Sequence, residues 1–157
     1  MSQSIIFRME FRVERVSASR LVNLRRKILR KNDPSAIVTN PLDDEEDTYH
    51  FAGLVNDEVV ATSSFYVSPS PINPTLKSYQ LRYMAVDFDV QGKGYGKAVL
   101  LKAEDELRQA GVEQLWAQGR DTALGFYSTL GWLKIDGSEH LSKETQLPHT
   151  TIYKKLV

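Results

Sequence analysis

A glycine-rich turn is the segment whose residue types point most directly to chemistry. It comprises Gln91, Gly92, Lys93, Gly94, Tyr95, Gly96 and Lys97, between an apolar strand-like run and a helix-like run. Glycine lets a backbone turn sharply and approach a ligand closely, because no Cβ stands in the way. The first amides of a helix have no partner within the helix and lie at the positive end of its dipole. With two lysines beside them, these amides predict a site for a phosphate or pyrophosphate group.

Two common phosphate-binding loops do not fit this turn. A Walker A loop needs Ser or Thr directly after its lysine to hold magnesium, and Ala98 follows Lys97. A Rossmann fingerprint that starts at Gly92 and Gly94 would need its third glycine at Lys97. From the turn alone, the alternative is an ordinary glycine-rich turn that binds nothing.

A second motif follows downstream, where residues 123–132 read Ala-Leu-Gly-Phe-Tyr-Ser-Thr-Leu-Gly-Trp. The two motifs together resemble the GCN5-related N-acetyltransferase (GNAT) superfamily, whose loop reads Gln/Arg-x-x-Gly-x-Gly/Ala and whose second motif reads Asn-x-x-Ala-x-x-Phe-Tyr-x-x-x-Gly-Phe. The matching residues are Gln91, Gly94, Gly96, Ala123, Phe126, Tyr127 and Gly131. Arg120 stands where the family has Asn, so no contact to CoA is carried over from that Asn. Trp132 replaces a Phe but keeps an aromatic ring. Packing in a core is the commoner role of adjacent aromatic residues, and it accounts well for Phe126.

The resemblance implies a site for acetyl-CoA as co-substrate. The turn would hold the pyrophosphate, and backbone groups of Met84, Ala85 and Val86 would pair with the pantetheine arm as if it were another strand. The strands on either side of the crossover helix would splay apart to admit that arm. A backbone amide near Val86 would face the thioester oxygen. Tyr127 would be the general acid that protonates the departing thiolate.

The general base is left open among Glu139, His140, His149 and a water molecule. An alkylamine titrates near about 10.4 and arrives mostly protonated, so some group must take its proton. The chain has no cysteine, which excludes disulfides, thiolate metal sites and an acetyl-cysteine intermediate. Direct attack of the amine on the thioester is therefore expected, with no metal.

A chain of 157 residues fits one domain over residues 1–157. Hydrophobic periodicity and turn residues predict its elements. These are a strand Ile5–Val16, a helix capped by Ser17 or Ser19 and ended by Asp33-Pro34, a hairpin of Tyr49–Val55 and Val59–Val67 around Asn56-Asp57-Glu58, a strand Tyr79–Val86, a helix Ala98–Ala110 closed by Gly111, a strand Val112–Ala117, a helix Thr122–Leu130 capped by Asp121 and closed by Gly131, and strands Trp132–Ile135 and Thr150–Leu156. A crossover beside hairpins predicts an α/β fold with a mixed sheet. The resemblance implies the acyl-CoA N-acyltransferase fold, with a mostly antiparallel central sheet flanked by helices.

Charge suggests partners only weakly. Twenty basic residues balance twenty acidic ones, so nucleic-acid binding is not expected. The first helix carries Arg20, Arg25, Arg26, Lys27, Arg30 and Lys31, which could select an anionic acceptor or touch RNA. The acidic run Asp43–Asp47 could attract a cationic acceptor, and a solvated helix face and loop are the expected alternatives. With no signal peptide and no membrane span in the sequence, we expect a cytoplasmic protein with no membrane partner, and a homodimer stays open.

The tail Gln146-Leu147-Pro148-His149 is similar to the Gly-Ile-Pro-His tail of some bacterial members of the superfamily, including those similar to ElaA, except at Gln146. Three functions follow from these features. The first is an acetyl-CoA-dependent N-acetyltransferase that acts on a primary amine of a small molecule or peptide. The second is a non-catalytic acyl-CoA-binding regulatory module, and the third is a nucleotide-binding module.

Overall fold

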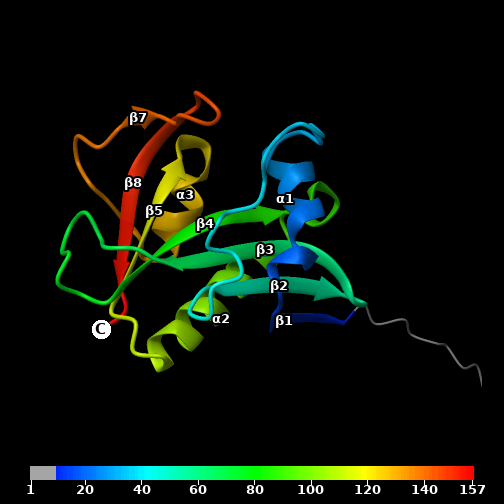
Figure 1. Cartoon of the computed structure of the whole chain (residues 1–157), viewed down its shortest axis with the longest axis horizontal. Helices are drawn as coiled ribbons and strands as arrows, with labels where there is room; N and C mark the ends of the chain where they lie inside the picture. The colour runs from blue at the N-terminus through cyan, green and yellow to red at the C-terminus, as the bar shows by residue number, and fades with distance from the viewer. Residues whose placement is uncertain (1–9) are drawn as a thin grey trace, which may run out of the picture.

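One mixed sheet organises the chain, and the computed structural model describes residues 10–157 (Figure 1). Its strands are β1 (Phe11–Arg15), β2 (Tyr49–Val55), β3 (Glu58–Val67), β4 (Ser78–Val86), β5 (Gln114–Arg120), β6 (Leu133–Lys134), β7 (His140–Leu141) and β8 (Pro148–Lys155). They lie in the order β1-β2-β3-β4-β5-β8-β6, and β7 also pairs with β8. Only β4 and β5 are parallel neighbours; every other described pair is antiparallel. The mostly antiparallel mixed sheet confirms the predicted fold class.

Three helices, α1 (Val22–Leu29), α2 (Tyr95–Gln109) and α3 (Leu124–Thr129), flank this sheet. Side chains alternate between the faces of a strand, so β2 shows which helix covers which face. Leu54 packs with Leu21 in the cluster before α1, whereas a Cβ on Gly53 would touch Val99 of α2. Helices α1 and α2 therefore cover opposite faces. No helix between residues 10 and 157 is long and apolar enough to cross a bilayer.

The hairpin of β2 and β3 follows its predicted turn residues. Asn56 and Asp57 both adopt positive φ, at 50° and 69°, as a two-residue turn between antiparallel strands favours. Strand β3 begins at Glu58, one residue before the predicted start. The predicted strand Ile5–Val16 is present from Phe11 to Arg15, and its residues 5–9 lie outside the described part of the chain.

The predicted helix caps are wrong in two places. Ser17 and Ser19 do not cap α1, because a 3-10 turn over Ala18–Arg20 comes first and the two hydroxyls bond each other at 3.0 Å. Asp121 does not cap α3 either. Its carboxylate accepts a hydrogen bond from the hydroxyl of Thr150, at 3.2 Å.

The helix ends match the prediction better where glycine closes them. Gly111 and Gly131 have φ of 86° and 88°, the left-handed conformation that glycine adopts without strain. Helix α1 ends at Leu29, before Asp33-Pro34, because Lys31 and Asn32 already adopt positive φ. Helix α2 begins at Tyr95, three residues before Ala98, so the glycine-rich turn includes its first turn.

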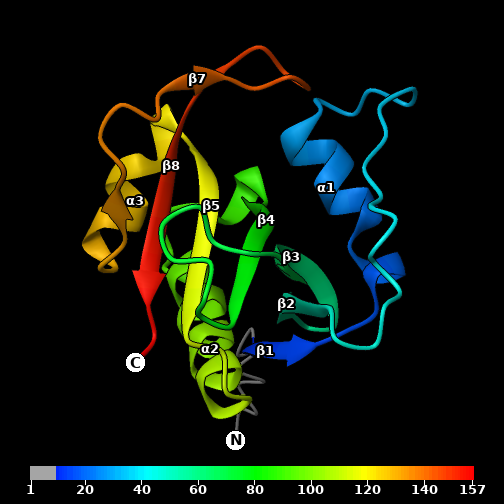
Figure 2. The ribbon, with the colours of Figure 1, turned by 60° about the vertical axis from the view of Figure 1, so that its left-hand side comes forward.

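The two parallel strands separate along their length. Their register runs only from Ser78↔Gln114 to Leu81↔Ala117. Beyond that point β4 stays with β3, and β5 stays with β8. Figure 2 shows the strands side by side at their beginnings and apart at their ends.

A bulge in β4 opposite β3 accompanies this separation, and Tyr83 lies within it at φ 57°. A bulge bends its strand and increases the local twist, which turns the end of β4 away from β5. The fold thus opens the sheet where the second half of β4 has no partner strand on the side of β5.

Candidate active site

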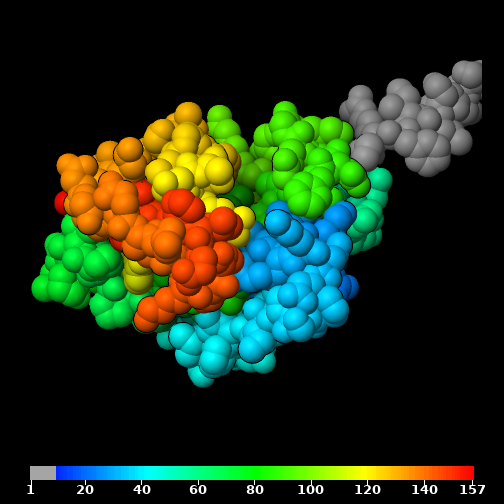
Figure 3. Space-filling model, turned by 90° about the horizontal axis from the view of Figure 1, so that it is seen from above, coloured from blue at the N-terminus to red at the C-terminus, as the bar shows by residue number. Residues whose placement is uncertain are grey.

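A cavity of about 1130 Å³ occupies the opening between β4 and β5. Its wall comes from the end of α1, from β4, the turn 91–97, β5, α3 and residues 140–145. Figure 3 views the face on which the segment after β7, in orange and red, approaches α1, in blue. Segments from both ends of the chain thus meet around one hollow.

The glycine-rich turn lines one end of this cavity with six of its seven predicted residues; Lys93 is the one that does not line it. Gly92 and Gly94 have φ of 84° and 82°, and a Cβ on either would meet nothing within 4 Å. They are therefore required for backbone conformation and leave open space beside the turn. No side chain caps the N-terminus of α2, so its first amides are available to an anion.

Two residues of the turn hold it in place. The Nε2 group of Gln91 donates to the carbonyl oxygen of Val86 at 3.0 Å, which ties the turn to the end of β4. Gly96 is buried, and a Cβ there would lie 3.0 Å from Cγ2 of Val86 and 3.4 Å from Cε of Met84. Glycine at this position lets α2 pack closely on β4.

The second half of β4 presents a backbone edge to the cavity. Ala85 and Val86 pair with Thr62 and Ala61 of β3, and Met84 lies at the register shift. All three line the cavity, on the side where the β5 register has ended. Their outward backbone groups can therefore bond an extended ligand laid along the strand.

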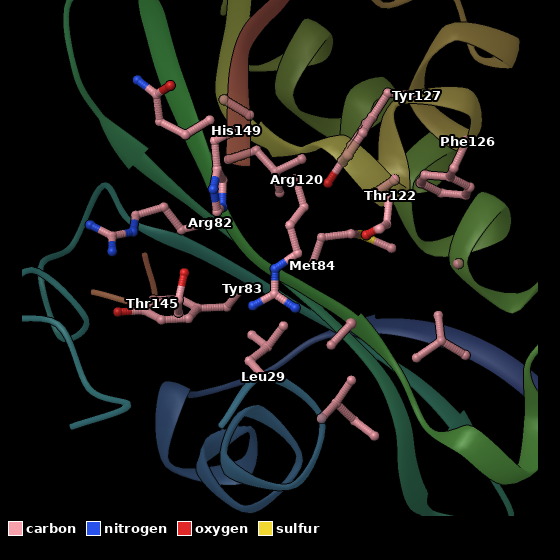
Figure 4. A pocket seen from close by; sticks show the side chains of 18 of the residues that line it. Leu29, Arg82, Tyr83, Met84, Arg120, Thr122, Phe126, Tyr127, Thr145 and His149 are labelled. Atoms are coloured by element: carbon pink, nitrogen blue, oxygen red, sulfur yellow. The ribbon is translucent and has the colours of Figure 1, made fainter. Parts of the chain in front are cut away.

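Tyr127 has a buried ring, and its hydroxyl reaches the cavity. The side chain is 7% exposed, and its ring packs on Phe126 and Trp132 with centroids 5.2 and 5.4 Å away. Figure 4 shows the hydroxyl pointing into the cavity near Met84 and Thr122. Burial raises the pKa of Tyr127 above the ordinary value, so the hydroxyl keeps its proton at neutral pH.

Of the three residues considered as a base, His140 and His149 line the cavity and Glu139 does not. The two histidines pair across β7 and β8, with ring centroids 6.0 Å apart. In each ring, Nδ1 lies 2.8 Å from a backbone carbonyl oxygen, that of Ser138 or Leu147. A carbonyl only accepts, so Nδ1 carries the hydrogen and Nε2 is free to take a proton.

Three arginines surround the part of the cavity that faces α1. Arg30 and Arg82 both bond the carboxylate of Glu144, at 3.2 and 2.9 Å. Arg120, the last residue of β5, extends into the cavity toward Leu29 and Tyr83 (Figure 4). The sequence prediction singled out Arg120 only as a departure from a motif, because its neighbours here come from distant segments.

We expected the charged runs of the first helix and of the acidic loop to be solvated, but Arg25 and Asp43 are buried. Arg25 is fully buried and bonds Asp43 at 3.0 Å and Ser64 at 2.8 Å. Its guanidinium also lies 4.0 Å from the ring centroid of Tyr83 at the bulge. Lys27 bonds Asp87 at 2.8 Å. This network connects α1 to the part of β4 that bends away from β5.

Comparisons with known proteins agree with this geometry. A sequence profile described as the acetyltransferase (GNAT) family matches residues 18–132. The uncharacterized N-acetyltransferase YitI of Bacillus subtilis is 24% identical over 148 residues, which cover 92% of this chain and 95% of YitI. Escherichia coli ElaA has a similar structure, with a TM-score of 0.71 at 18% identity over 94% of this chain and 99% of ElaA. FeeM, an N-acyl amino acid synthase from uncultured soil microbes, has a TM-score of 0.73 at 11% identity over 95% and 92% of the two chains.

Proposed function

We propose that this chain, which belongs to the acetyltransferase (GNAT) family, transfers an acetyl group from acetyl-CoA to a primary amine of a small molecule or peptide. The observation that supports this most is the separation of β4 from β5 above an open helix N-terminus. A cavity of about 1130 Å³ is large for a small-molecule site, which suits a long cofactor arm and an acceptor together.

The turn and the β4 edge suit the two chemically different parts of CoA. The amides at the start of α2 and the side chain of Lys97 would bind the pyrophosphate, because both favour negative charge. The backbone of Met84, Ala85 and Val86 would bond the amides of the pantetheine arm, as a sheet edge bonds an added strand. A backbone amide near Val86 would then face the thioester oxygen.

The transfer itself needs one proton removed and one supplied. The amine nitrogen attacks the acetyl carbon directly, so an N–C bond forms and the C–S bond breaks. His140 or His149 would take the amine proton at Nε2, alone or through a water molecule. Tyr127 would give its hydroxyl proton to the departing sulfur, and its position in the cavity supports that role.

Ligand binding tests the first half of this proposal. CoA or acetyl-CoA at about 100 times its Kd should add about 2.7 kcal/mol to the free energy of unfolding, seen as a higher melting temperature. ATP and NAD should give no comparable shift. A shift with ATP or NAD and none with CoA would contradict the proposal and favour a nucleotide-binding module.

A panel of amines tests the second half, with free thiol as the readout. Thiol release that depends on both acetyl-CoA and an amine is the expected result. Binding of acetyl-CoA without release of the CoA thiol in the presence of any amine would instead identify a non-catalytic acyl-CoA-binding module.

A further inference from the structure

Arg120 is a cation in the cavity with no counter-ion among residues 10–157. Among residues 10–157 its guanidinium makes no hydrogen bond and no ion pair. Burial lowers its pKa, and the charge of Arg30 lowers it further. Both effects disfavour the charged guanidinium, and a bound anion would offset them.

Among residues 10–157, Glu144 is the one acidic residue that lines the cavity, and it is already engaged. Two acidic residues outside the lining are bonded elsewhere, Asp87 to Lys27 and Asp121 to the hydroxyl of Thr150. Glu144 is shared between Arg30 and Arg82. This part of the cavity therefore holds three guanidinium groups and one carboxylate.

The side chain of Arg120 extends toward Leu29 of α1 (Figure 4). Arg30, whose charge acts on Arg120, follows α1, which covers the face of the sheet opposite α2. The open N-terminus of α2 lies on the other face, at the glycine-rich turn. An anion at Arg120 thus approaches from the side of α1, from which the acceptor would reach the thioester.

Glu144 shows which anion this region accommodates. Its carboxylate bridges Arg30 and Arg82 at 3.2 and 2.9 Å. The side chain of Glu144 is 55% exposed on the segment between β7 and β8. It can therefore give up one arginine to an incoming carboxylate of the same shape.

We propose that the acceptor amine carries a carboxylate, which Arg120 binds. This inference rests on the proposed acetyl transfer and names its substrate class as amino acids in the broad sense. The bound carboxylate orients the acceptor, and the free amine faces the thioester between β4 and β5.

Matched substrate pairs test the inference. Glycine, β-alanine and γ-aminobutyrate are each compared with their own carboxamide, at equal concentrations of the neutral amine. Each pair keeps the chain length and changes only the charge. A charge-assisted pair of hydrogen bonds predicts a kcat/KM about 10- to 100-fold higher for the carboxylate in at least one pair.

Variants then assign the preference to Arg120. In Arg120→Gln the KM for the carboxylate substrate should rise about 10- to 100-fold, while turnover of its carboxamide stays near the parent value. The KM for acetyl-CoA should stay within about twofold. Arg120→Lys should keep part of the preference, because it keeps the charge and loses the planar fork. Arg20→Gln removes an arginine that does not line the cavity and should change none of these values.

Each outcome decides between the two proposals. Equal turnover of carboxylates and carboxamides would overturn the inference and leave acetyl transfer standing. Weaker binding of acetyl-CoA by Arg120→Gln, with the acceptor KM unchanged, would move Arg120 to the CoA site and overturn the inference too. Absence of thiol release with every amine, charged or neutral, would overturn both.

Discussion

At the scale of a single residue, the surroundings of Tyr127 keep its hydroxyl protonated and fixed in the cavity. Its ring is held by Phe126 and Trp132, so the hydroxyl has little freedom to leave the cavity. Burial raises its pKa, because the phenolate would lose its solvation. Burial makes the phenol a weaker acid but keeps its proton in place, and the departing thiolate becomes more basic in the same cavity because it is desolvated there too.

Replacing Tyr127 by Phe should slow turnover and spare binding. The ring and its packing stay, and only the hydroxyl is lost. We expect kcat to fall about 10²–10⁴-fold, with the KM for acetyl-CoA nearly unchanged because the hydroxyl acts mainly in the transition state. Steady-state thiol release, with melting measured beside it, gives both quantities.

Tyr153→Phe is the matched control, because Tyr153 lies on β8 and does not line the cavity. It should keep parental turnover. If Tyr127→Phe also stayed within a few-fold of the parent, a water molecule and not Tyr127 would supply the proton.

At the scale of elements, the turn between β4 and α2 needs glycine for two different reasons. Gly94 adopts φ 82° beside open space, whereas Gly96 has ordinary helical φ and lacks room for a Cβ. The first sets the direction of the turn toward the cavity, and the second sets the distance of the helix from the sheet. A phosphate bound at the turn needs both.

Gly94→Val should therefore weaken CoA binding, because its side chain would fill the space beside the turn. The left-handed conformation adds strain of about 1–2 kcal/mol to that variant, so stability has to be controlled. Gly137→Val supplies the control, since Gly137 has φ 79°, open space around it and no place in the cavity wall.

Calorimetric titration with CoA measures the effect on both proteins. The two variants should lose similar stability, and only Gly94→Val should lose affinity, by about tenfold or more. Parental affinity in Gly94→Val would show that the turn does not hold the pyrophosphate.

At the scale of the whole molecule, two buried tyrosines make the stability of the fold depend on pH in the alkaline range. Burial raises the pKa of Tyr66, as does its hydrogen bond to Asp43, and burial raises the pKa of Tyr127. In the unfolded chain both titrate near about 10. Above that pH the unfolded chain has lost protons that the folded protein keeps, so stability falls as pH rises.

Unfolding in urea from pH 8 to pH 11 measures this loss. Below about pH 10 these two groups should not change the free energy of unfolding. Above that pH each should lower it by at most about 1.4 kcal/mol per pH unit. Tyr127→Phe should decline less steeply than the parent. Parallel curves for the two proteins would show that Tyr127 titrates alike in both states.

Features that depend on a few adjacent residues were predictable from the sequence. The hairpin turn at Asn56 and Asp57 and the helix ends at Gly111 and Gly131 follow from which residues tolerate positive φ. The glycine-rich turn belongs to the same class, since its conformation and the helix after it are local. The helix caps were wrong because several polar residues near a helix start can serve, and packing selects among them.

The sequence by itself thus determined the family, the order of the elements except for β7, and the turn that faces the cavity. Only the tertiary structure decided how wide β4 and β5 separate and which side chains meet in the opening. Arg120, Glu144 and His149 lie on different segments. The pairing of β5 with β8 brings Arg120 beside His149, and the pairing of β7 with β8 places the segment that carries Glu144. Convergence of this kind is set by long-range packing and charge, which no local pattern of residue types encodes.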